Sequence, residues 1–153
     1  MLSMSHQRLS MHDIDPAAYQ SVLAMERYVR NSGLEKPLYE LIKIRASQLN
    51  GCAYCLDMHN RDARAGGEDQ RRLDILSAWR EAPDLFSERE RAALAFTESV
   101  TLIGHGGVPD DVWDDAHKQF DDAGMVHLLM AVSVINVWNR LAVSTHQDLP
   151  EIS

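Results

Sequence analysis

The sequence predicts an all-α fold, a single-domain helical bundle of about seven helices joined by short loops. Three observations predict it. The chain has 153 residues, which suits one domain and is long enough to bury a core. Its apolar residues recur at helical spacing, and no stretch alternates as a half-buried strand does. Capping residues, prolines and glycines divide the chain into helical segments.

The first two helices are bounded by clear signals. Asp15 followed by Pro16 predicts a helix start, because aspartate caps a helix and proline fits its first position. Apolar residues then keep helical spacing up to the Asn-Ser-Gly stop at 31–33. Pro37 begins the second helix, and Gly51 predicts a left-handed cap at its end.

Three further helices follow in the middle of the chain. The third begins near Cys52 and ends at the glycine pair 66–67, and a fourth covers about 69–80. The fifth begins at a capping box, in which Ser87 and Glu90 satisfy each other's backbone N–H groups.

The last two helices complete the bundle. Pro109 opens a short acidic helix, and the longest helix follows Gly124 and ends near Thr145. A strand is the rival interpretation for 132–137, where β-branched residues cluster. The apolar pattern continues well past the length of a strand, so we favour a helix.

The domain covers residues 15–147, between a flexible N-terminus at 1–14 and a C-terminal tail at 148–153. The longest apolar run, 125–138, falls short of the roughly 18 residues that indicate a membrane helix. The first residues lack the apolar core of a signal peptide. We therefore expect a cytoplasmic location and no membrane contact.

The charge balance excludes one class of partner. Lys and Arg number 15 against 23 Asp and Glu, a formal net charge of -8. Proteins that bind nucleic acid need a basic face, so we expect no nucleic-acid partner.

Two cysteines and a histidine carry the chemistry. Cys52, Cys55 and His59 lie at i, i+3 and i+7, within a stripe of about 60° on one helix face. The cysteines begin that helix, where free backbone N–H groups and the helix dipole stabilise a thiolate. His59 is one turn beyond Cys55 and could act as the base that activates it.

Glu40 lies on the preceding helix, nearly three turns before the Gly51 turn. A tight turn would fold the two helices antiparallel, so Glu40 and His59 could meet across the pair. A carboxylate there would orient the imidazole and accept its proton. The plainer interpretation is that Glu40 forms an ion pair with Lys36 or Lys43.

Other interpretations of these residues stay open. The cysteine pair could be inert core, or half of a zinc site completed by His59 and Glu40. In the last helix, the polar residues Asn136 and Asn139 indicate a buried hydrogen-bond network or a subunit contact. The chain shows neither a phosphate-binding loop nor a dinucleotide-binding motif, so we expect no bound cofactor or metal and a separate reductant.

The segment from Glu40 to His59 closely resembles the AhpD-like alkylhydroperoxidase branch of the carboxymuconolactone decarboxylase family. That branch is marked by a glutamate, eleven residues, and then C-x-x-C-x-x-x-H, which Glu40, Cys52, Cys55 and His59 match in type and spacing. Supporting similarity extends to the segments 78–80, 88–94 and 136–141.

The resemblance implies an all-helical subunit assembled as a homotrimer or homohexamer. It implies that Cys55 attacks a peroxide and that Cys52, as the more exposed thiol, closes the disulfide and meets the reductant. His59 and Glu40 would form the proton relay. Some members carry a histidine between the cysteines, where this chain has alanine and tyrosine.

The expected function is that of a thiol-dependent peroxidase or disulfide oxidoreductase in antioxidant defence. Its expected partners are a peroxide and an external dithiol, carried by a lipoyl- or thioredoxin-like protein. The alternatives are a lactone decarboxylase of the same superfamily and a redox sensor without catalysis.

Overall fold

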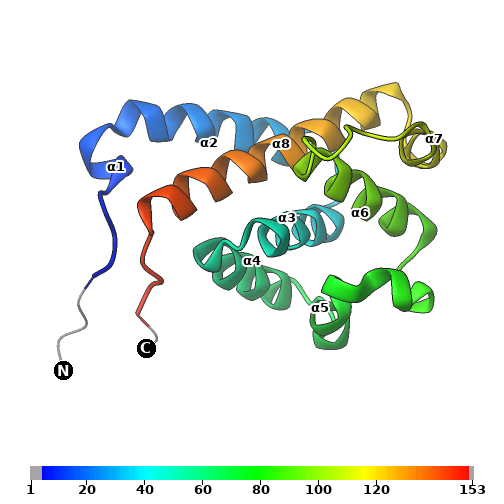
Figure 1. The fold of residues 1–153 in the computed structure, drawn as a ribbon, viewed down its shortest axis with the longest axis horizontal. Helices are drawn as coiled ribbons and strands as arrows, with labels where there is room; N and C mark the ends of the chain where they lie inside the picture. Colours follow the sequence, from blue (N-terminus) through cyan, green and yellow to red (C-terminus); the bar gives the residue numbers. More distant parts are fainter. Residues whose placement is uncertain (1–4, 152–153) are drawn as a thin grey trace.

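The computed structural model describes residues 5–151, and this part of the chain is all-α, as predicted (Figure 1). Its helices are α1 (Met11–Ile14), α2 (Pro16–Arg30), α3 (Lys36–Asn50), α4 (Ala53–Ala65), α5 (Gln70–Ile75), α6 (Glu88–Thr101), α7 (Asp110–Gln119) and α8 (Asp122–Thr145), with short 3-10 helices η1 (Leu76–Glu81) and η2 (Pro83–Leu85). The expected helix over 69–80 therefore divides into α5 and η1, and α1 is an addition.

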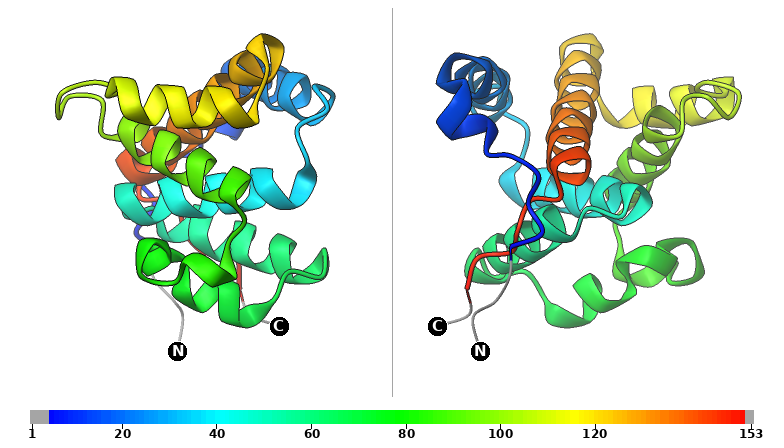
Figure 2. Two further views of the ribbon diagram at one scale, coloured as in Figure 1. Left: turned by 90° about the vertical axis from the view of Figure 1, so that its right-hand side faces the viewer. Right: turned by 60° about the vertical axis from the view of Figure 1, so that its left-hand side comes forward.

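Two helices form the centre of the fold. Helix α8 packs against α2, α3 and α6, and Figure 2 shows it between α2 on one side and the α6–α7 pair on the other. Helix α3 packs against α4, α6 and α8 and contributes to three apolar clusters. Because neighbours cover α3 on nearly every side, its polar residues Glu40, Lys43 and Ser47 are buried with its apolar ones.

Local signals explain most helix ends. Asp15 accepts a hydrogen bond from the backbone of Ala18, and the capping box of Ser87 and Glu90 is present. Helix α8 begins at Asp122 instead of after Gly124, because the Asp121 carboxylate accepts the N–H of Gly124 at 2.7 Å and caps the helix earlier.

The described parts of the two chain ends contact each other. The backbone N–H of Arg8 donates to the carbonyl of Thr145 at 2.8 Å, and that of His6 donates to the Asp148 carboxylate at 3.2 Å. The expected flexible ends thus lie side by side between residues 5 and 151. Residues 1–4 and 152–153 lie outside the described residues.

The apolar run at 125–138 lies within the longest helix of the described residues, as expected. Helix α8 has 24 residues and is the one helix within residues 5–151 that could cross a membrane by length and composition. The polar residues within it do not interrupt it, because several of them are paired inside the fold. The same composition is found in core helices, and α8 lies at the centre of this fold.

A buried amide network joins α8 to the end of α3, which confirms one of the two interpretations of its asparagines. The Asn50 side chain donates to the side-chain oxygens of Asn136, at 3.0 Å, and Asn139, at 2.9 Å. Asn139 in turn donates to the Ser47 hydroxyl at 3.0 Å. These bonds hold the turn between α3 and α4 against α8.

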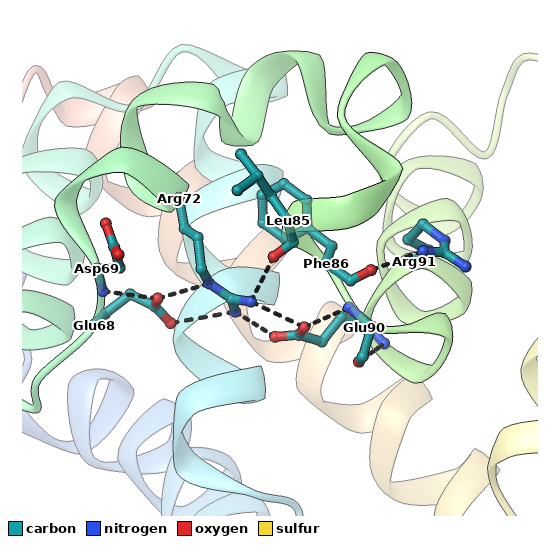
Figure 3. Close-up of polar contacts among 8 residues, drawn as sticks. Glu68, Asp69, Arg72, Leu85, Phe86, Glu90 and Arg91 are labelled. Carbon is teal, nitrogen blue, oxygen red and sulfur yellow. Dashed lines mark hydrogen bonds and ion pairs between the residues drawn. The ribbon is translucent and has the colours of Figure 1, made fainter.

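A second network supports the peripheral helices. Arg72 of α5 lies between Glu68 and Glu90 and also donates to the carbonyl of Leu85 at 2.7 Å (Figure 3). The Arg72 guanidinium thus links α5, the η2 segment and the capping box of α6. Burial raises the pKa of the Glu90 carboxyl, but the hydrogen bonds from Arg72 and Ser87 and the charge of Arg72 together outweigh burial and lower it overall.

Replacing Arg72 by leucine is expected to destabilise the fold by about 2–3 kcal/mol, since two half-buried carboxylates lose their shared cation. Urea unfolding at pH 7 measures the change. Arg71→Leu is the matched control, because Arg71 is the exposed neighbour on the same helix. Equal losses of stability in the two variants would show that the network adds nothing.

Candidate active site

The turn between α3 and α4 places the cysteines. Gly51 adopts the left-handed conformation with φ 64°, as the sequence predicts for a helix C-cap. The backbone N–H of Cys52 donates to the carbonyl of Ser47 at 3.0 Å, which closes the turn. Cys52 is consequently the N-cap of α4, and its sulfur accepts the N–H of Cys55 at 3.3 Å.

The two cysteines form a disulfide, with their Cα atoms 5.4 Å apart. Both residues are 1% exposed. The expectation that Cys52 is the more exposed thiol is therefore wrong, because the turn buries both sulfurs equally against Ala142 and Tyr54. The zinc alternative requires two thiolates, which this oxidised form does not offer.

Glu40 and His59 meet across the α3–α4 pair. The Nδ1 atom of His59 lies 3.5 Å from Oε2 of Glu40, and the two residues are 5% and 6% exposed. Within residues 5–151, neither ring nitrogen of His59 nor Oε2 of Glu40 has a hydrogen-bond partner. Such atoms are expected to bind something when the site works, since burying them unpaired is costly.

Lys43 holds the other oxygen of Glu40. Its Nζ lies 3.0 Å from Oε1 of Glu40, 3.9 Å from Oε1 of Glu26 and 4.1 Å from the centre of the Tyr39 ring. The ion pair with Lys43 that the sequence offered as the plain alternative therefore exists beside the contact with His59. The Glu40 carboxylate thus contacts Lys43 through Oε1 and His59 through Oε2.

Sequence reasoning missed Glu26 and Tyr39. The Tyr39 hydroxyl donates to Oε2 of Glu26 at 2.8 Å, and Arg30 lies 3.4 Å from the same carboxylate. The signal for Glu26 was present: it lies between Val22 and Val29 on the buried face of α2. A charge on an apolar helix face indicates a buried partner.

The surroundings set the protonation states of this cluster. Burial raises the pKa of the Glu40 carboxyl, but His59 and Lys43 together outweigh it, and the pKa lies below its usual value. Burial and the Glu26 carboxylate raise the pKa of the Tyr39 hydroxyl far above its usual value. Glu40 is consequently charged at neutral pH, and Tyr39 stays a proton donor to Glu26.

The two cysteines line different cavities. Cys55 and His59 line an open cavity of about 680 Å³ whose walls are largely apolar and aromatic: Tyr19, Leu23, Tyr54, Met58 and Trp138. Cys52 lines a wider hollow of about 900 Å³, bounded by the chain ends at His6 and 146–149. Each cysteine thus borders a cavity of its own, and Tyr54, Ala142 and Gln147 line both cavities.

Comparison with known proteins identifies the family to which the chain belongs. The model of the carboxymuconolactone decarboxylase family matches residues 16–99, more than half of the chain and all of the Glu40–His59 segment. The chain belongs to the carboxymuconolactone decarboxylase family. It is an AhpD-like member of that family, whose members are enzymes.

The relatives differ in how far they match. The uncharacterised protein YdfG of Bacillus subtilis is 41% identical over 138 residues, 90% of this chain and 93% of its own length. YnjA of Escherichia coli, also uncharacterised, is 27% identical over 79% of this chain and 64% of its own length.

Two solved structures share the fold. A protein of unknown function from Agrobacterium tumefaciens, provisionally described as the antioxidant defence protein AhpD, has a TM-score of 0.92 and 39% identity, with 95% of this chain and 99% of that chain covered. A peroxidase-related protein from Silicibacter sp. TM1040 has a TM-score of 0.73 and 24% identity, with 83% and 67% covered, and it supports the fold alone.

Proposed function

We propose that this family member is a thiol-dependent peroxidase that cycles between a dithiol and the Cys52–Cys55 disulfide. One observation carries the proposal: Cys55 and His59 line the same cavity, and Glu40 lies behind His59 at 3.5 Å. A nucleophile, a base and a group that orients the base are the parts that thiol catalysis needs.

The chemistry would proceed in two steps. The Cys55 thiolate attacks one peroxide oxygen, the O–O bond breaks, and the departing alkoxide takes a proton from His59. Cys55 is then a sulfenic acid. The Cys52 thiol gives its proton to the relay of His59 and Glu40 and attacks the Cys55 sulfur, which forms the disulfide. The S–O bond breaks, and the departing hydroxide takes that proton back from the relay and leaves as water. An external dithiol supplies two electrons and two protons to restore both thiols.

The cavity walls favour an organic hydroperoxide over hydrogen peroxide. Tyr19 and Trp138, whose rings lie 5.3 Å apart, offer apolar surface to an alkyl or aryl group next to Cys55. The separate hollow at Cys52 suits a slender dithiol arm, such as one carried by a lipoyl- or thioredoxin-like protein.

The proposal includes a cellular location and an oligomeric state. A cytoplasmic location would supply the reductant. A homotrimer or homohexamer is supported by apolar side chains exposed on one subunit, among them Val126, Leu129 and Val143 of α8. Light scattering in solution gives the number of subunits.

The test is consumption of cumene hydroperoxide by the purified protein with dihydrolipoamide as reductant, beside Cys55→Ser. The proposal requires catalytic turnover that the substitution removes. Reversible disulfide formation without turnover would favour a redox sensor, which the equal burial of both sulfurs supports. If neither peroxide turnover nor reversible disulfide formation is observed, lactone decarboxylation is the activity to assay next.

His59→Ala is expected to lower the peroxide reaction rate by about 10²–10⁴-fold, the usual contribution of a general acid or base. The pH profile of the rate should also change, because the substitution removes a proton carrier from the relay. Asn60→Ala, on the same helix, is the control. A pH profile identical to the wild type would exclude His59 from the relay.

A further inference from the structure

We propose that Glu40, His59 and Asp62 form a reversible binding site for Zn²⁺. Asp62 follows His59 by one turn of α4, and Glu40 faces both from α3. One ligand atom from each residue lies within 4.8 Å of the other two. The zinc site itself is independent of the peroxidase proposal.

Unpaired atoms point to a ligand here. Oε2 of Glu40 and both ring nitrogens of His59 are buried without a hydrogen-bond partner within residues 5–151. Asp62 is exposed and lines the same open cavity as His59, so an ion has a route to the buried pair. Glu40 and His59 supply buried ligand atoms, and Asp62 supplies an exposed ligand at the mouth of the cavity.

The separation between His59 and Glu40 fits a shared zinc ion better than a direct hydrogen bond. Zinc binds nitrogen and oxygen ligands at about 2.0–2.1 Å, so two ligands of a tetrahedral ion lie about 3.3 Å apart. The observed separation of Nδ1 of His59 and Oε2 of Glu40 is 3.5 Å. One imidazole and two carboxylates offer nitrogen and oxygen ligands that zinc accepts, with water as the fourth ligand, whereas Mg²⁺ and Ca²⁺ prefer oxygen ligands.

Charge sets the strength of the site. Lys43 occupies Oε1 of Glu40 and leaves Oε2 free, but its ammonium group repels a second cation. Glu26 offsets part of this charge through its own contact with Lys43. We therefore infer a regulatory site from which zinc dissociates, and not a structural one.

Binding would have a consequence that rests on the proposed function. The ion would occupy the His59 nitrogen and the Glu40 oxygen that face each other in the proton relay. Zinc would thereby hold the enzyme in an inactive state until it dissociates.

Isothermal titration of Zn²⁺ into the oxidised protein tests the site, because the disulfide removes thiolate ligands. We expect one ion per chain, at least tenfold weaker binding in Asp62→Asn, and no such binding in His59→Ala. Asp57→Asn is the matched control, since Asp57 lies on α4 and pairs with Arg61 at 2.7 Å. No binding to the wild type would overturn the proposal, as would equal binding by Asp62→Asn.

A second measurement tests the consequence. Pre-reduced protein, freed of reductant, is mixed with hydroperoxide with and without zinc. Zinc should slow the wild type and leave Asp62→Asn unaffected. If zinc slows the wild type and Asp62→Asn equally, the ion acts on the thiolates, and the proposed inhibition through the Glu40–His59–Asp62 site is wrong. If the wild type fails to react even without zinc, the peroxidase proposal fails and the titration still decides the zinc site.

Discussion

Cys55→Ser and Cys52→Ser are each expected to reduce catalytic peroxide turnover to the background rate, because one sulfur cannot close the dithiol–disulfide cycle. The two variants should differ in a single turnover. Cys52→Ser keeps the attacking thiol of the proposed mechanism and should consume one equivalent of hydroperoxide. Cys55→Ser should consume none.

Stopped-flow measurement of peroxide loss, with mass spectrometry of the dimedone-trapped sulfenic acid, separates these outcomes. Ala53→Ser is the matched control, because it adds a hydroxyl to the same turn at an exposed position. Sustained turnover by either cysteine variant contradicts the two-cysteine cycle. A sulfenic acid on Cys52 in Cys55→Ser would reverse the proposed roles and leave the cycle intact.

Lys43→Met is expected to destabilise the protein by about 3–5 kcal/mol at pH 7, the usual result of removing one partner from a buried ion pair. Lys43 is 3% exposed and lies between Glu26 and Glu40, so its loss leaves two buried carboxylates without their shared cation. Lys36→Met is the control, since Lys36 is exposed on the same helix.

The pH dependence of this loss has a definite sign. In the wild type, the pKa of the Glu40 carboxyl is below its usual value of about 4.3, so its ionisation adds stability above that pH, which is lost as the pH falls through the lowered pKa. Without Lys43, burial should raise the pKa of Glu40, and the folded protein should bind a proton more readily. The deficit of Lys43→Met should therefore shrink as the pH falls from 7 towards 4.

Urea unfolding of wild type, Lys43→Met and Lys36→Met at pH 7 and pH 5 measures this difference. A deficit of the same size at both pH values would mean that packing of the lysine side chain, and not its charge, supports the site. The peroxide reaction of Lys43→Met should also slow, since a protonated Glu40 cannot accept a proton from His59.

Local sequence signals determined the helical class and most helix ends. A cap depends on one or two side chains and the backbone beside them, so Asp15, Gly51 and the Ser87–Glu90 box act where they stand. The 3-10 helix η1 after α5 was missed because its shape depends on the packing of Leu76 and Trp79 into the core.

The spacing of Cys52, Cys55 and His59 on one helix, and their approach to Glu40 across a tight turn, also followed from sequence. Helical periodicity orders the residues on a face, but it does not say which neighbours cover that face. Only the tertiary structure brought Glu26 of α2 to Lys43, buried the two sulfurs equally and opened a separate cavity beside each. These features depend on the packing of α2, α8 and the chain ends around the α3–α4 pair, contacts between residues far apart in the chain.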